Sequence, residues 1–99
     1  MNIMKLMNAE QQHAKHPTTF EIPDRSKRAA VRSGDIVKLA FISAEGSGER
    51  MWVKVIECVE GRAYVGVLTN CPLFLPLRDG EIVRFGPEHV LDIWPSNAV

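Results

Sequence analysis

The clearest pattern in the chain is an alternation of apolar and polar residues between positions 50 and 68. Two β-rich runs, Arg50–Glu57 and Ala63–Leu68, flank a turn signal at Glu60-Gly61. This arrangement predicts a β-hairpin. One face of it would carry Met51, Val53 and Val55 opposite Tyr64, Gly66 and Leu68. Because Gly66 has no side chain to pack, it marks a bend, a bulge or a close backbone approach.

Shorter runs on either side of the hairpin complete a β-rich pattern. Residues 36–42 place Val37, Leu39 and Phe41 on one face, and residues 81–85 read as a short strand. Residues 18–22 suggest an extended segment, and residues 88–94 a last strand or a single helical turn. Short strands at this spacing are typical of small barrels. The predicted fold is α+β, mostly β: a small curved antiparallel sheet or SH3-like barrel of four to five strands with one or two short helices.

The N-terminal part of the chain is polar and lacks a strand pattern. Residues 10–15 could form a turn or two of helix before Pro17, and a helix this short is marginal alone. A second short helix is expected after Asp24, a plausible N-cap, with Ser33-Gly34 as its stop. We therefore expect a mobile N-terminal arm or a loosely docked helix over 1–17, one β-rich domain over 18–94 and a tail over 95–99.

Composition and charge narrow the range of functions. The 99 residues are 45% hydrophobic, which suits a single domain with its own core. Twelve basic and twelve acidic side chains cancel, so general binding to nucleic acid or to anionic membranes is disfavoured. No apolar run approaches the roughly 20 residues of a membrane span, and no signal peptide is apparent. We expect a cytoplasmic protein that does not bind membranes.

The two cysteines and three histidines suggest no chemistry. In the predicted hairpin Cys58 lies near the turn and Cys71 at the far end of the returning strand, too far apart for a disulfide. Cys71 and His89 are the only pair that could support a small hydrolase, and no helix N-terminus follows Cys71 to lower its pKa. Neither His13 with His16 nor the set of Glu88, His89 and Asp92 with Cys71 matches a zinc pattern. We expect no catalytic residue, metal or cofactor.

A cluster of basic residues lies on or near the second predicted helix. It consists of Arg25, Lys27, Arg28 and Arg32. Its ordinary interpretation is a solvated helix face, and the alternative is a local patch for RNA, DNA or an acidic partner.

Trp52 and Lys54 fall on the face of the hairpin opposite Met51, Val53 and Val55. An aromatic side chain on a partly exposed face is a candidate for partner contact, with burial in the core as the other interpretation. The candidate contact surface comprises Trp52, Lys54, Asn70, Pro72, His89, Asp92 and Trp94.

Several motifs along the chain resemble a known family. They lie in residues 19–23, 34–39, 49–53, 64–70 and 85–93, and they include Met-Trp-Val, Gly-x-Leu-x-Asn-x-Pro and a terminal Glu-His-hydrophobic-hydrophobic-Asp. In this order they resemble the YegJ-like family of bacterial domains of unknown function, over about residues 18–94. The resemblance implies a small α+β domain with a curved antiparallel sheet and no catalytic residue. Cys71 stands where such proteins often have an acidic residue, so no carboxylate role is expected there.

These observations predict a non-enzymatic protein-binding or accessory module with an unidentified protein partner. The alternative is a nucleic-acid-binding module that uses the basic cluster, and a small hydrolase or metal protein is a weaker one. The oligomeric state is left open.

Overall fold

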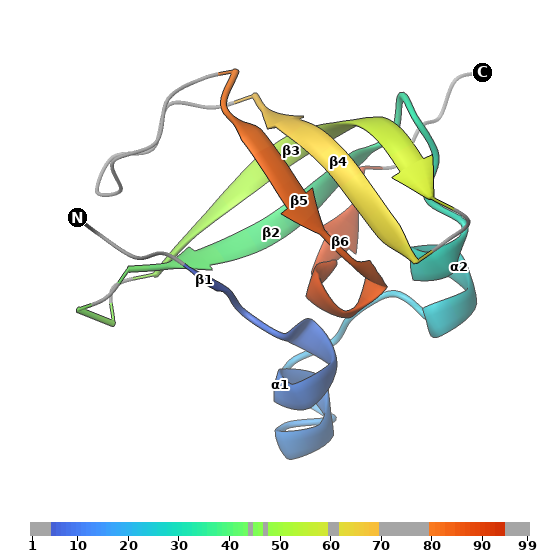
Figure 1. Cartoon of the computed structure of the whole chain (residues 1–99). Helices are drawn as coiled ribbons and strands as arrows, with labels where there is room; N and C mark the ends of the chain where they lie inside the picture. Colours follow the sequence, from blue (N-terminus) through green and yellow to red (C-terminus); the bar gives the residue numbers. More distant parts are fainter. Residues whose placement is uncertain (1–4, 44, 47, 60–61, 70–79, 95–99) are drawn as a thin grey trace.

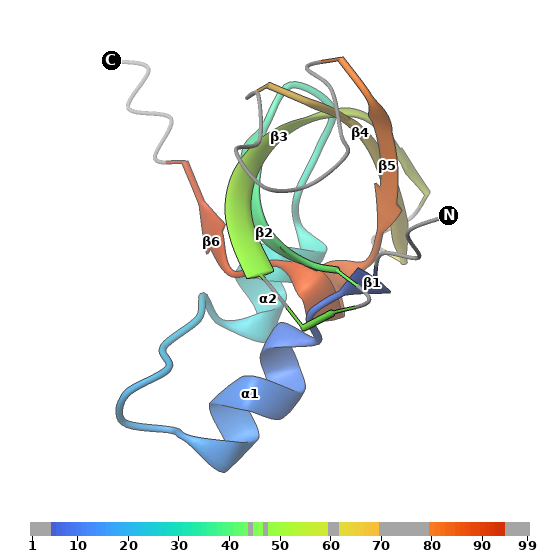
Figure 2. The same ribbon diagram turned by 90° about the vertical axis from the view of Figure 1, so that its left-hand side faces the viewer.

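A single antiparallel sheet, curled into a half-barrel, makes up most of the molecule (Figures 1 and 2). It is seen in a computed structural model that describes residues 5–43, 45–46, 48–59, 62–69 and 80–94. The elements are β1 (Lys5–Leu6), α1 (Ala9–Lys15), α2 (Arg25–Ala29), β2 (Ile36–Ile42), β3 (Gly48–Val59), β4 (Ala63–Leu68), β5 (Ile82–Phe85), the 3₁₀ helix η1 (Pro87–His89) and β6 (Asp92–Ile93). The strand order is β1-β2-β3-β4-β5, with β6 also paired to β2. The predicted α+β, mostly β fold is confirmed.

The predicted central hairpin is present as β3 and β4. Val53 pairs with Leu68 and Val55 with Gly66, so the expected residues share the inner face of the curl. The register shifts between Val55 and Glu57, which places a β-bulge next to the Gly66 pair. A bulge increases local twist, so the bend predicted from Gly66 lies beside the point where β3 departs from regular geometry.

Position 66 has no room for a side chain, so it requires glycine. A Cβ at this position would lie 2.4 Å from Cγ1 of Val53 and 2.9 Å from the carbonyl oxygen of Lys54. The inner face of β4 therefore approaches β3 too closely for any side chain, which lets the sheet curl tightly.

The hollow of the half-barrel holds the main hydrophobic core. Most inner-face positions of the middle strands are apolar, as the alternation predicted, although Glu49 pairs with inner-face Phe41. The core residues are Val31, Val37, Leu39, Phe41, Met51, Val53, Val55, Tyr64, Leu68, Val83, Phe85 and Val90. At about 1.5–3 kcal/mol for each large side chain taken out of water, this core supplies the main stabilisation.

A second, smaller cluster lies on the outer face of β2. Ala40, an outer-face residue, packs with Ala9 of α1 and Leu91, and Phe20 and Ile22 close over the group. The Met7 amide also donates to the Ala40 carbonyl oxygen at 2.9 Å. Residues 5–15 are therefore packed on the sheet, because α1 covers an apolar patch that alternation alone could not assign.

Arg28 joins α1, α2 and η1 at a buried position. Only 5% of it is exposed. Its guanidinium donates to the carbonyl oxygens of Pro23 and Pro87 at 2.8 and 2.9 Å, and to Oε2 of Glu10 at 2.5 Å. Its own carbonyl oxygen accepts the Tyr64 hydroxyl at 2.7 Å. These bonds satisfy a cation that would otherwise be costly to bury.

Three segments differ in detail from the local predictions. The predicted extended segment at residues 18–22 forms no strand, because its apolar residues pack onto Ala40 while its backbone turns. Helix α2 begins after Asp24 as expected, but the Asp24 side chain makes no capping hydrogen bond. Residues 88–94 contain both a helical turn, η1, and a short strand, β6.

Candidate functional site

The outer face of β6, β2 and β3 brings two tryptophans together. Lys38 pairs with both Trp52 and Asp92, so these three side chains form one row across the sheet. Trp94 follows β6, and its amide donates to the carbonyl oxygen of Ile36 at 2.7 Å. The rings of Trp52 and Trp94 meet edge to face, with centroids 5.0 Å apart.

The structure shows whether the two tryptophans lie in the core or on the surface, which the sequence left open. Trp52 is half-buried on the outer face, whereas 52% of Trp94 is exposed. The Lys38 ammonium lies 4.8 Å from the centroid of the Trp52 ring, within cation–π range. Neither tryptophan belongs to the hydrophobic core inside the half-barrel. We call Lys38, Trp52, Asp92 and Trp94 the tryptophan face.

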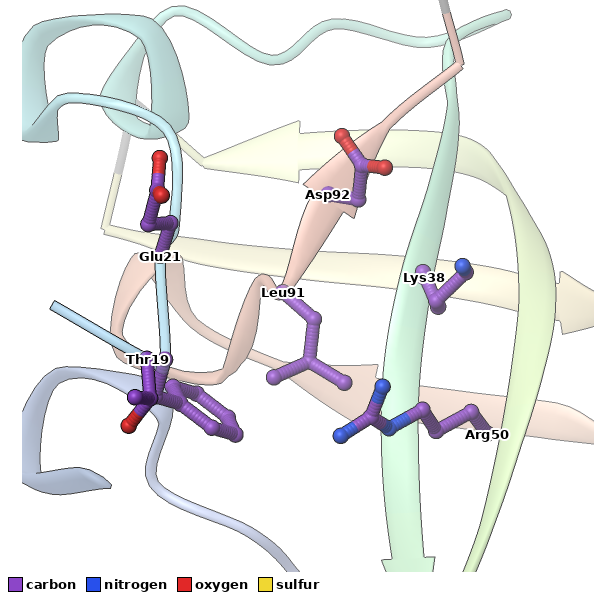
Figure 3. A pocket seen from close by; sticks show the side chains of 7 residues that line it. Thr19, Glu21, Lys38, Arg50, Leu91 and Asp92 are labelled. Atoms are coloured by element: carbon purple, nitrogen blue, oxygen red, sulfur yellow. The ribbon is translucent and has the colours of Figure 1, made fainter. Parts of the chain in front are cut away.

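A small pocket adjoins the tryptophan face. Its volume is about 160 Å³, and its lining is Thr19, Phe20, Glu21, Lys38, Arg50, Leu91 and Asp92. Figure 3 shows Thr19 and Glu21 on one side and Lys38 and Arg50 on the other, with Leu91 between them. The loop before α2 supplies one wall because Phe20 and Ile22 are anchored on Ala40. The second cluster therefore shapes this pocket.

The hollow continues along the same loop. A second pocket of about 390 Å³ shares Glu21, Leu91 and Asp92 with the first and adds Ile22, Pro23, Lys27 and Ile93. Together the two pockets run from the tryptophan face toward α2, a shape that could accommodate an extended chain.

The structure unites part of the predicted contact surface. Trp52, Asp92 and Trp94 lie together, and Lys54 lies next to Trp52 on β3, paired with Ile36. Asn70 and Pro72 lie outside the described residues. His89 stabilises η1, because its Nδ1 accepts a hydrogen bond from the Gly86 amide at 2.9 Å.

The predicted basic patch does not form as a unit. Arg28 is buried, so it is not part of a surface patch. Arg25 is 76% exposed at its side chain but donates to Oε2 of Glu10 at 3.0 Å. Lys27 and Arg32 are exposed. The physical reason is that Arg28 faces inward, toward Glu10 and two carbonyl groups, which helical spacing alone did not reveal.

The metal and thiol hypotheses gain no support from the geometry. In the described part of the chain, no group of three or more His, Cys, Asp or Glu side chains could hold a metal ion. His13 instead contacts the Phe20 carbonyl oxygen at 2.7 Å. Cys58 is an exposed free thiol, and Cys71 lies outside the described residues.

Two site residues were missed by sequence reasoning. Lys38 and Arg50 line the first pocket beside residues of the loop before α2. The alternation in β2 placed Lys38 on the outer face, which was a usable signal. What it could not show was that a loop from earlier in the chain would close over that face.

Comparison of the chain with protein-family models, curated proteins and solved structures found no match. The YegJ-like resemblance therefore remains a prediction, and function has to be inferred from the site itself. Among the described helices, none has the length and apolar character needed to cross a membrane.

Proposed function

We propose that this domain is a non-enzymatic binding module that recognises a segment of another protein on its tryptophan face. The observation that carries the proposal is Trp94, which exposes half of its surface while its ring packs edge to face on Trp52. Large aromatic side chains dominate binding energy at protein interfaces. Because the contact with Trp52 already orients the Trp94 ring, less conformational entropy would be lost on binding.

The neighbouring pockets support the same function. They are shallow hollows between a loop and a sheet, and they continue the tryptophan face toward α2. Such a surface can position a flexible segment without performing chemistry on it. We retain the predictions that the domain acts in the cytoplasm and is related to the YegJ-like group.

Nucleic-acid binding through the basic cluster is the weaker candidate. Of its four members, Arg28 is buried and Arg25 is paired with Glu10. Phosphate affinity depends on several accessible cations acting together, so this cluster offers less than its sequence suggests.

The test is selection of short peptides from a displayed random library on the immobilised full chain. Peptides that are enriched should bind the wild-type protein in a fluorescence anisotropy titration. Trp94→Ala should weaken that binding by about 2 kcal/mol or more, roughly 30-fold, as expected for a central aromatic contact.

The control is Ile82→Ala on β5, which removes a side chain that is similarly exposed at 51%. It should leave the affinity unchanged. Failure to enrich any peptide, or equal binding by wild type and Trp94→Ala, would contradict the proposal. Thermal unfolding of both variants shows that they are folded.

A further inference from the structure

Two cations in the first pocket are held over aromatic rings. Lys38 lies over Trp52, and Cζ of Arg50 lies 5.9 Å from the centroid of the Phe20 ring. Among the described residues, Arg25 and Arg28 form ion pairs with Glu10, whereas no ion pair between described residues includes Lys38 or Arg50. A cation that rests on a ring keeps its hydrogen-bond donors available to an anion.

The sheet register brings these cations to one place. Lys38 pairs with Trp52 and Ala40 pairs with Arg50, so Lys38 and Arg50 are diagonal neighbours on the same outer face. Diagonal neighbours have Cα atoms roughly 7–8 Å apart, within joint reach of one small anion for side chains this long. Figure 3 shows both side chains at the same edge of the pocket, beside Leu91.

The charges around the two pockets favour an anionic ligand. Lys27, Lys38 and Arg50 line them, and exposed Lys54 lies next to Trp52 on β3. The acidic side chains that line them are Glu21 and Asp92, and Oδ1 of Asp92 already accepts the Ile93 amide at 2.8 Å. The three cations that line the pockets therefore outnumber the two carboxylates that line them.

The distance from the pocket to Trp94 indicates that an extended peptide could reach both. Asp92 lines the pocket, and Trp94 lies two residues farther along the same segment, about 7 Å away at strand spacing. Two residues of an extended peptide cover the same distance. A segment lying along β6 could thus place one side chain on Trp94 and another in the pocket.

We infer that the partner segment is an extended acidic peptide, in which an Asp or Glu carboxylate binds between Lys38 and Arg50. An apolar residue two positions away rests on Trp94. This inference deepens the proposed function and depends on it. A nucleic-acid strand fits less well, because its repeated phosphates would pass the carboxylates of Glu21 and Asp92, whereas a peptide needs to place only one anion.

The test compares two displayed peptide libraries on the full chain, one with a fixed Glu and one with a fixed Lys. We expect enrichment from the Glu library, with an apolar residue two positions from the Glu. In anisotropy titrations, changing that Glu to Gln in the peptide should weaken binding about tenfold, the usual loss for a charge-assisted hydrogen bond.

The variant Arg50→Gln should cause a similar loss with the Glu peptide and almost none with the Gln peptide, since the two changes remove the same contact. The matched control is Arg84→Gln, which removes an equal charge from exposed Arg84 on β5 and should have no effect. Affinity for the Glu peptide should also fall as salt is raised.

Each outcome separates the two proposals. If Trp94→Ala abolishes binding but Arg50→Gln does not, the binding module stands and the acidic ligand is refuted. Preferential enrichment from the Lys library, or tighter binding of a single-stranded oligonucleotide than of the Glu peptide at equal salt, also refutes the acidic ligand. If neither library is enriched, or Trp94→Ala binds as wild type does, the proposed function itself fails.

Discussion

Replacement of Gly66 by alanine tests whether close packing of β4 on β3 sets the curl of the sheet. The added methyl group would lie 2.4 Å from Cγ1 of Val53, 2.9 Å from the Lys54 carbonyl oxygen and 3.4 Å from Cε1 of Phe85. Val53 is fully buried, so its side chain has no solvent space into which it could rotate. The oxygen of Lys54 belongs to the backbone and cannot move alone.

The expected cost follows from these distances. Overpacking of a close-packed core by one methyl group costs about 1–3 kcal/mol. The control is Gly48→Ala in the same sheet, where the nearest atom to the new Cβ is the Phe41 carbonyl oxygen at an ordinary 3.7 Å. That substitution should be neutral or stabilise the fold by about 0.4–1 kcal/mol, through lower entropy of the unfolded chain. Because both substitutions lower the entropy of the unfolded chain alike, we expect the two variants to differ by the overpacking cost, about 1–3 kcal/mol.

Urea and thermal unfolding followed by far-ultraviolet circular dichroism measure this difference. For a domain of this size it corresponds to melting temperatures roughly 5–25 °C apart. In the double variant, Val53→Ala removes the clashing Cγ1, so the combined destabilisation should be less than the sum of the single ones. A Gly66→Ala variant within about 0.5 kcal/mol of Gly48→Ala would refute the claim that β4 must approach β3 this closely.

Three further predictions concern the buried connection between α1, α2 and the sheet. Tyr64→Phe removes the hydroxyl that donates a hydrogen bond to the Arg28 carbonyl oxygen. It should lower the free energy of unfolding, measured by urea titration, by about 1–2 kcal/mol. An unchanged free energy of unfolding would show that water replaces that bond. Burial raises the pKa of Tyr64, so its absorbance change to tyrosinate should occur above the ordinary value of 10.0 in the folded protein, and titration at or below that value would contradict its buried position. The hydrogen bond from Arg28 holds the pKa of Glu10 below its ordinary value of 4.5, so the folded state binds this proton less readily than the unfolded state. The stabilisation from the contact between Glu10 and Arg28 is therefore complete above pH 4.5 and is lost as pH falls through the lowered pKa of Glu10. The difference in unfolding free energy between wild type and Glu10→Gln should shrink over the same range of pH. A difference that does not change with pH would refute this prediction.

Local patterns in the sequence were sufficient for the sheet and its inner face. Val37, Leu39 and Phe41 alternate with residues of the outer face, and the hairpin residues do the same, so period-two patterning alone assigned them to the core. Gly66 was also conspicuous, because a glycine inside an apolar strand has few physical explanations. These features depend on residues that are close along the chain or across a short turn, so they can be predicted from the sequence without knowledge of the tertiary structure.

The outer face of β2 was decided by tertiary structure. Helix α1 and the loop containing Phe20 cover this face, while β1 and β6, from the start and the end of the chain, pair with the edge of the same strand. An outer-face alanine such as Ala40 carries no signal that another segment will cover it. The burial of Arg28 was hidden for the same reason, since its hydrogen-bond partners come from three other segments.

The candidate site shows the same division. The sequence by itself determined that Trp52 lies outside the core face of the hairpin, because alternation sets the direction of each strand residue. Only the tertiary structure decided that Trp94 would meet it and that Lys38 and Arg50 would share a pocket with Asp92. This arrangement results from pairing between strands that are distant in sequence, and such pairing forms only when the whole hydrophobic core is packed.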